Sequence, residues 1–415
     1  MKFNEMVYEH LSYEAIKGEF EPLLAKLEGV SDSSTFMEVF SEINRFREHV
    51  FTMETLCSIR HTIDTSDEFY DKENEYWNET KPLLEVFENR LSKIVLAYPK
   101  REELAIPEVY FKIQENALKC FSEEIIEDLQ KENKLCSEYS KLKASQKISF
   151  RGEEYTISQI GKFFKSSDRD TRREAYLASF SVYEGIEKEL DRIYDELVHV
   201  RTLIASKLGF DSYVELGYLR MNRIGYNREM VQKLREEVVR EVVPVVNKIY
   251  AKQAERIGLD KLYIYDEGFE FVSGNPTPKG TYEELVEYAL QMYSDMSEET
   301  KEFFTFMKEN ELFDLVAKPN KETGGYCTVI EEYKSPFIFS NFKGTSGDVD
   351  VLTHEAGHAF QCYCTMKHMD IPECLWPTNE SCEIHSMSME FFAYPWMNLF
   401  FKEEEAKYKY SHLAS

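Results

Sequence analysis

Residues 344–361 read GTSGDVDVLTHEAGHAFQ, a pattern that combines a helix with a pair of histidines. Thr345 or Ser346 can cap a helix, and the apolar positions that follow recur with helical spacing. On this predicted helix His354 and His358 are four residues apart, so their side chains project from one face about one turn apart. Two imidazoles at that separation can bind one Zn²⁺. The stretch therefore predicts a helix that carries two metal ligands.

The acidic residue inside the motif predicts the chemistry of such a site. Glu355 follows the first histidine directly, so its carboxylate can accept a proton from a zinc-bound water and pass it to a leaving amine. A hydrolytic zinc ion needs three protein ligands and one open position. The metzincin pattern would place Gly and His three and six residues after His358, but Gln361 and Cys364 stand there.

The third ligand is therefore expected on the next helix. Residues 377–379, Pro-Thr-Asn, look like a helix start. Three glutamates follow it, namely Glu380, Glu383 and Glu390. The predicted helix start does not by itself show which of the three glutamates is the third zinc ligand.

Residues 324–392 closely resemble the oligoendopeptidase F group of the M3, thimet oligopeptidase-like, zinc metallopeptidases. The resemblance rests on the segments GGYCT, SPFIFSNFKGTSGDVDVLTHEAGHAFQ and EIHSMSMEFF. The upstream segments LGFDSYVELGY and SGNPTPKG look similar too, so the resemblance covers most of residues 147–392. In that family the third ligand is the first glutamate of a pattern Glu-x-x-Ser-x-x-x-Glu, which Glu383, Ser386 and Glu390 match here.

The resemblance implies a complete reaction centre. One Zn²⁺ per chain would be bound by His354, His358 and Glu383, and Glu355 would be the general base. The implied activity is that of a zinc metalloendopeptidase, a hydrolase that cleaves peptide bonds in short oligopeptides. A deep groove between two lobes would admit an extended peptide and exclude a folded protein.

Further residues can support such a site. Asp350 lies one turn before His354 and could accept a hydrogen bond from its second ring nitrogen, and Glu390 on the ligand helix could do the same. For both carboxylates the alternative is simple solvation. Gly357 costs roughly 1 kcal/mol inside a helix relative to alanine, so a close approach of another backbone is expected there.

A small sheet is expected directly before the motif. Residues 326–330 and 336–342 are rich in Val, Ile, Phe, Tyr and Thr, and the polar link 331–335 suits a hairpin. The resemblance implies that the second strand is an exposed edge, to which a peptide adds as a further strand. The residues expected to contact substrate are Phe337, Ile338, Phe339, Ser340 and Asn341. Without the resemblance, an ordinary core strand is the expectation.

Most of the remaining chain has apolar residues at helical spacing, and residues 147–157 predict a β-hairpin. Together with the resemblance, this predicts a mainly α fold: a two-lobed helical metallopeptidase of the zincin, gluzincin type, with a small β-sheet next to the active-site helix. We place an N-terminal helical lobe at residues 1–150 and a catalytic lobe at residues 151–415.

The amino-acid composition indicates which kinds of binding partner to expect. Acidic residues outnumber basic ones 76 to 50, and a net charge of −26 would repel a phosphate backbone or an anionic membrane face. We therefore expect short peptides as partners, and neither nucleic acid nor membrane. Because the sequence shows no signal peptide and no apolar run of about 18 residues, a cytoplasmic protein is expected.

The C-terminal end bears on catalysis. In the resembling family, Tyr and His residues well downstream of the third ligand stabilise the oxyanion. The sequence ends at Ser415, so one expectation is a fragment whose catalytic lobe is incomplete. The alternative is a complete chain in which a tail residue supplies that donor: Tyr394, Tyr408, Tyr410 or His412. Two other functions stay open, a related helical metallocarboxypeptidase or dipeptidyl carboxypeptidase, and a catalytically weakened zinc-containing peptide-binding fragment.

Overall fold

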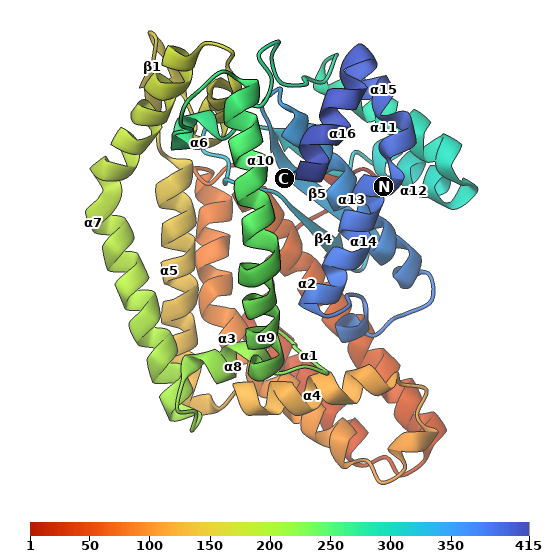
Figure 1. Cartoon of the computed structure of the whole chain (residues 1–415). Helices are drawn as coiled ribbons and strands as arrows, with labels where there is room; N and C mark the ends of the chain where they lie inside the picture. The colour runs from red at the N-terminus through yellow and green to blue at the C-terminus, as the bar shows by residue number, and fades with distance from the viewer. Residues whose placement is uncertain (415) are drawn as a thin grey trace.

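Helices make up most of the computed structural model, which describes residues 1–414 (Figure 1). The helices of the first half are α1 (Tyr13–Glu28), α2 (Ser33–Ile63), α3 (Glu68–Ala97), α4 (Glu108–Cys120), α5 (Ile126–Ala144), α6 (Ile157–Ile160) and α7 (Arg169–Lys207). Those of the second half are α8 (Tyr213–Arg220), α9 (Arg228–Glu237), α10 (Val243–Arg256), α11 (Tyr282–Met296), α12 (Glu298–Glu309), α13 (Ser346–Met366), α14 (Asn379–Phe392), α15 (Met397–Phe401) and α16 (Glu405–Ala414). The predicted mainly α fold class is confirmed.

Two small sheets complete the fold. β1 (Ile148–Phe150) and β2 (Glu153–Tyr155) form the predicted hairpin, with Arg151 and Gly152 at positive φ in its turn. The second sheet contains β3 (Phe313–Val316), β4 (Tyr326–Ile330) and β5 (Ser335–Phe342) in the order β3-β5-β4. Strand β5 is antiparallel to β4, as the hairpin pattern predicted, and parallel to β3.

The sheet order corrects the predicted edge strand. Strand β5 lies in the centre, with both sides hydrogen-bonded to neighbouring strands. Its residues Phe337, Ile338, Phe339 and Ser340 are buried, and only Asn341 is half-buried. The expectation that this strand forms the exposed edge is wrong, because β3 pairs with one side of β5 and β4 pairs with the other. The outer edge on the other side of the sheet belongs to β4.

One apolar core extends across the expected lobe boundary at residue 150. The rings of Phe3 and Phe337 are 4.5 Å apart, and both belong to a buried cluster that runs from the N-terminal helices to α16. The division into residues 1–150 and 151–415 stays a prediction. Among residues 1–414, no helix combines the length and apolar character needed to cross a membrane.

Strand β5 leads directly into α13, and local hydrogen bonds fix where this helix begins. The carboxylate of Asp348 accepts hydrogen bonds from the backbone N–H groups of Lys343, Gly344 and Thr345. These bonds hold the N-cap residue Thr345 and the two residues before it against the first turn of the helix, where the helix dipole favours a carboxylate. Helix α13 packs against strands β4 and β5 of the sheet and against α14 (Figure 1).

Candidate metal centre

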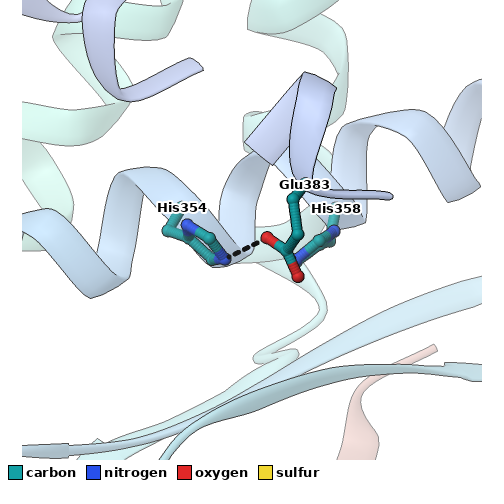
Figure 2. A group of neighbouring side chains, drawn as sticks. All are labelled: His354, His358 and Glu383. Carbon is teal, nitrogen blue, oxygen red and sulfur yellow. Dashed lines mark ion pairs between the residues drawn. The ribbon is translucent and has the colours of Figure 1, made fainter. Parts of the chain in front are cut away.

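Three side chains from two helices converge on one point. His354 and His358 project from α13, and Glu383 reaches them from the second turn of α14 (Figure 2). Oε2 of Glu383 lies 3.1 Å from Nε2 of His354 and 3.7 Å from Nε2 of His358. One potential ligand atom from each residue lies within 4.8 Å of the others. Of the three glutamates that the sequence left open, the structure brings Glu383 to both histidines.

These separations suit a zinc ion. Zinc–ligand distances of about 2.0–2.2 Å in a tetrahedron place neighbouring ligand atoms roughly 3.3–3.6 Å apart. The distances from Glu383 to the two histidines, 3.1 and 3.7 Å, lie close to that range. Two imidazoles and one carboxylate are also the donor set of hydrolytic zinc sites that keep one position open. The residues present therefore fit zinc.

The other glutamates of α14 lie elsewhere. Glu380 accepts a hydrogen bond from Arg223 at 2.8 Å and another from the hydroxyl of Tyr226. These contacts join the first turn of α14 to the loop between α8 and α9. Glu380 is thus engaged away from the histidines, and its contacts help to hold the beginning of the ligand helix.

Helices α13 and α14 touch at a glycine. A Cβ atom at Gly357 would lie 2.7 Å from Cα of Ser386 and 3.0 Å from the carbonyl oxygen of His385. The close approach expected from the sequence is therefore present, and its partner is the backbone of the ligand helix. Ser386 is fully buried and donates a hydrogen bond to Oε2 of Glu383 at 2.8 Å, which orients this carboxylate toward α13.

Glu355 lies on α13 beside the two histidines, in a buried position. Glu355 is 8% exposed, and this burial raises the pKa of its carboxyl group to about 7. The nearby negative charge of Glu383 also raises this pKa. A carboxyl group whose pKa lies near neutral pH is well matched to accepting and returning a proton. A bound divalent cation would favour its ionised form.

A carboxylate from α14 contacts His354 at the ring nitrogen that does not face Glu383. Oε1 of Glu390 lies 2.7 Å from Nδ1 of His354, which leaves Nε2 facing Glu383. Burial disfavours the charge on Glu390, but hydrogen bonds from His354 and His412 lower its pKa to about 2. Glu390 therefore remains an anion that accepts hydrogen bonds, which is the contact expected of a residue supporting a ligand.

Asp350 makes a different contact. Its Oδ1 accepts a hydrogen bond from the hydroxyl of Tyr408 on α16, at 2.7 Å. Because both ring nitrogens of His354 face Glu383 and Glu390, the structure places Glu390, rather than Asp350, at Nδ1 of His354.

Two further histidines lie near the centre: His385, which the sequence did not assign to it, and His412, which the sequence offered only as a candidate oxyanion donor. Nε2 of His385 lies 3.3 Å from Nδ1 of His358, on the side of that ring away from Glu383. His412 lies with Nε2 2.6 Å from Oε2 of Glu390. Helical periodicity predicts which face of its own helix a residue occupies. It does not predict which side chains of another helix that residue contacts, so the contacts of His385 and His412 could not be predicted from it.

The family is established by sequence models that match most of the chain. The model described as Peptidase family M3 matches residues 163–413, and the model of the Peptidase M3 N-terminal domain matches residues 3–121. The mainly helical fold and the histidine and glutamate site are those of an M3 metallopeptidase. The chain belongs to peptidase family M3 and is similar to oligoendopeptidase F.

Curated relatives are similar over part of the chain. An oligoendopeptidase F homolog of Borreliella burgdorferi is 25% identical over 219 residues, which are 52% of this chain and 36% of the relative. The chromosomal oligoendopeptidase F of Lactococcus lactis subsp. cremoris is 22% identical over 213 residues, 51% of this chain and 34% of the relative. The matched region thus spans about a third of the length of these relatives.

Solved structures extend the similarity to the whole chain. PZ peptidase A, solved with an inhibitor, is 51% identical, with a TM-score of 0.98 over 100% of this chain and 74% of its own. Oligoendopeptidase F from Enterococcus faecium is 14% identical, with a TM-score of 0.51 over 97% of this chain and 71% of its own, and it shows a likeness of fold alone.

Proposed function

We propose that the protein is a zinc-dependent endopeptidase that hydrolyses peptide bonds in short oligopeptides. The observation that carries the proposal is the convergence of His354, His358 and Glu383, with the buried carboxyl group of Glu355 beside them. Zinc held by these three ligands would supply a Lewis acid that polarises the scissile carbonyl and lowers the pKa of the attacking water.

The side chains of the protein have separate tasks in this reaction. Glu355 accepts the proton of the attacking water and returns it to the leaving amine, for which its raised pKa suits it. Ser386 orients the carboxylate of Glu383, and Glu390 fixes the ring of His354 with Nε2 toward the site. Rigid contacts of this kind keep the ligands in place before a substrate binds.

The outer edge of β4 offers a place for the substrate main chain. Among the described residues, β4 pairs with β5 on one side only. A Cβ atom at Gly325, directly before β4, would lie 3.8 Å from Oε1 of Glu355, so this edge begins beside the proposed base. A peptide pairing with β4 would run past the site in an extended form. Such a binding mode suits cleavage inside a short peptide and excludes a folded protein.

The test combines metal analysis with cleavage. Zinc content would be measured on the purified protein, and a quenched fluorescent peptide library would be incubated with it before and after chelation and zinc readdition. Internal cuts that depend on zinc support the proposal. Release of single residues or dipeptides from the C-terminus would favour a carboxypeptidase instead, and bound zinc without cleavage would favour a peptide-binding fragment. Lack of zinc binding would contradict all three functions.

A further inference from the structure

The carboxylate of Glu390 joins two histidines from different helices. Its Oε1 lies 2.7 Å from Nδ1 of His354 on α13, and its Oε2 lies 2.6 Å from Nε2 of His412 on α16. The side chains of Glu390 and His412 are only 13% and 8% exposed. The C-terminal helix therefore contacts the proposed zinc ligand His354 through a single half-buried carboxylate.

The chemistry of these groups assigns the direction of each hydrogen bond. An ionised carboxylate only accepts, so His354 donates through Nδ1 and His412 donates through Nε2. Nε2 of His354 is then left with its lone pair toward Glu383, as a metal ligand requires. In a neutral His412 imidazole Nδ1 is then an acceptor, and the hydroxyl of Tyr394 lies 2.7 Å from it. With His412 neutral, the chain from Tyr394 through His412 and Glu390 to His354 has one consistent arrangement of protons.

Helix α16 is fixed on α13 by a neighbouring contact. Tyr408, one turn before His412, is 1% exposed and donates a hydrogen bond to Asp350, one turn before His354. Its ring also stacks on Phe401, with centroids 4.2 Å apart. The packing of Tyr408 therefore helps to place His412 beside Glu390.

We propose that His412 and Tyr394 are positioning residues for the zinc ligand His354 and act on it through Glu390. This inference rests on the proposed zinc-dependent function. With both oxygens engaged, the carboxylate of Glu390 has one orientation, and the ring of His354 is held in the rotamer and tautomer that present Nε2. Without His412, one oxygen of Glu390 loses its partner, the carboxylate can rotate, and the ligand is less well organised.

The primary measurement is the dissociation constant for zinc, obtained by competition with a fluorescent chelator. His412→Ala is expected to weaken zinc binding by about 10-fold, the lower end of the effect of such supporting residues. His412→Gln is expected to recover part of the loss, because an amide N–H can still donate to Glu390. Tyr394→Phe should have a smaller effect in the same direction. Leu413→Ala, at a side chain 67% exposed on the same helix, is the matched control and should leave zinc binding unchanged.

A double-mutant cycle separates positioning from general stability. If His412 acts through Glu390, His412→Ala should add less than about two-fold to the loss caused by Glu390→Gln. Full additivity would overturn the inference, as would equal affinity of the wild type and His412→Ala. The visible spectrum of the Co²⁺-substituted protein should change in His412→Ala and not in Leu413→Ala. A wild type that binds no zinc would instead contradict the proposed function itself, so the two failures are distinguishable.

Discussion

Gly357 of α13 and Ser386 of α14 are so close that a Cβ atom at residue 357 would lie 2.7 Å from Cα of Ser386. Contacts of real Cβ atoms at that distance essentially do not occur, and the neighbour here is backbone. The approach matters for function because Glu383, one turn before Ser386, is brought to the two histidines by the same helix. The close packing of α13 and α14 therefore also sets the position of Glu383 relative to His354 and His358.

Gly357→Ala should accordingly displace α14 and reduce zinc affinity. In an unconstrained helix this substitution would stabilise by up to about 1 kcal/mol, so a loss of stability here would identify the clash. Thermal unfolding and zinc titration would both be measured. Gly185→Ala in α7 is the control, because a Cβ atom there would meet nothing within 4 Å. Equal behaviour of the two variants would contradict the close packing.

Removal of any one proposed ligand should reduce bound zinc well below one equivalent. We expect this for His354→Ala, His358→Ala and Glu383→Ala, because two remaining ligands are too few for a stable hydrolytic site. Glu380→Ala is the comparison on the same helix, because it removes only contacts to Arg223 and Tyr226 and leaves all three proposed ligands in place. The zinc content of each variant would be measured by elemental analysis. Loss of zinc from Glu380→Ala, with normal zinc content in Glu383→Ala, would show that the third ligand is wrongly assigned.

Glu355→Gln should separate metal binding from chemistry. The amide preserves the shape of the side chain but cannot accept the proton, so zinc should remain bound while peptide cleavage falls by at least about 10²-fold. Cleavage would be followed under single-turnover conditions, together with zinc content. Turnover near that of the wild type would rule out Glu355 as the base.

A buried carboxyl group away from the site should make stability depend on pH. Oε2 of Glu331 has no hydrogen-bond partner among the described residues, and burial raises its pKa to about 8 from a usual value of 4.5. The folded state thus holds a proton that the unfolded state releases. Its contribution to stability is present below about pH 4.5 and is lost as the pH rises through about 8.

Glu331→Gln should remove this dependence. At about pH 8.5 the variant should be more stable than the wild type by at least about 1 kcal/mol, and at about pH 5 the difference should be much smaller. Urea unfolding at the two pH values gives the free energies. Glu298→Gln, at a side chain 88% exposed, should show no such difference between them. A pH-independent effect of Glu331→Gln would mean that the carboxyl group is ionised throughout.

Local chemistry made part of this structure readable from the sequence. The helix that carries His354 and His358 follows from a spacing of four residues, and the hairpin at 148–155 follows from alternation around a turn at Arg151–Gly152. The cost of glycine within a helix also marked Gly357 as a contact point. Each of these signals depends only on residues a few positions apart.

The sequence by itself determined the helical class, the hairpins and the motif, whereas the tertiary structure alone decided what lies beside them. Strand β3 was not anticipated, and its parallel pairing puts β5 in the centre of the sheet and leaves the outer edge to β4. Likewise, Glu390 meets His354 and His412 only because α13, α14 and α16 pack together. The physical reason is that spacing within an element fixes a face, while strand order and side-chain partners depend on hydrogen bonds and packing between distant segments.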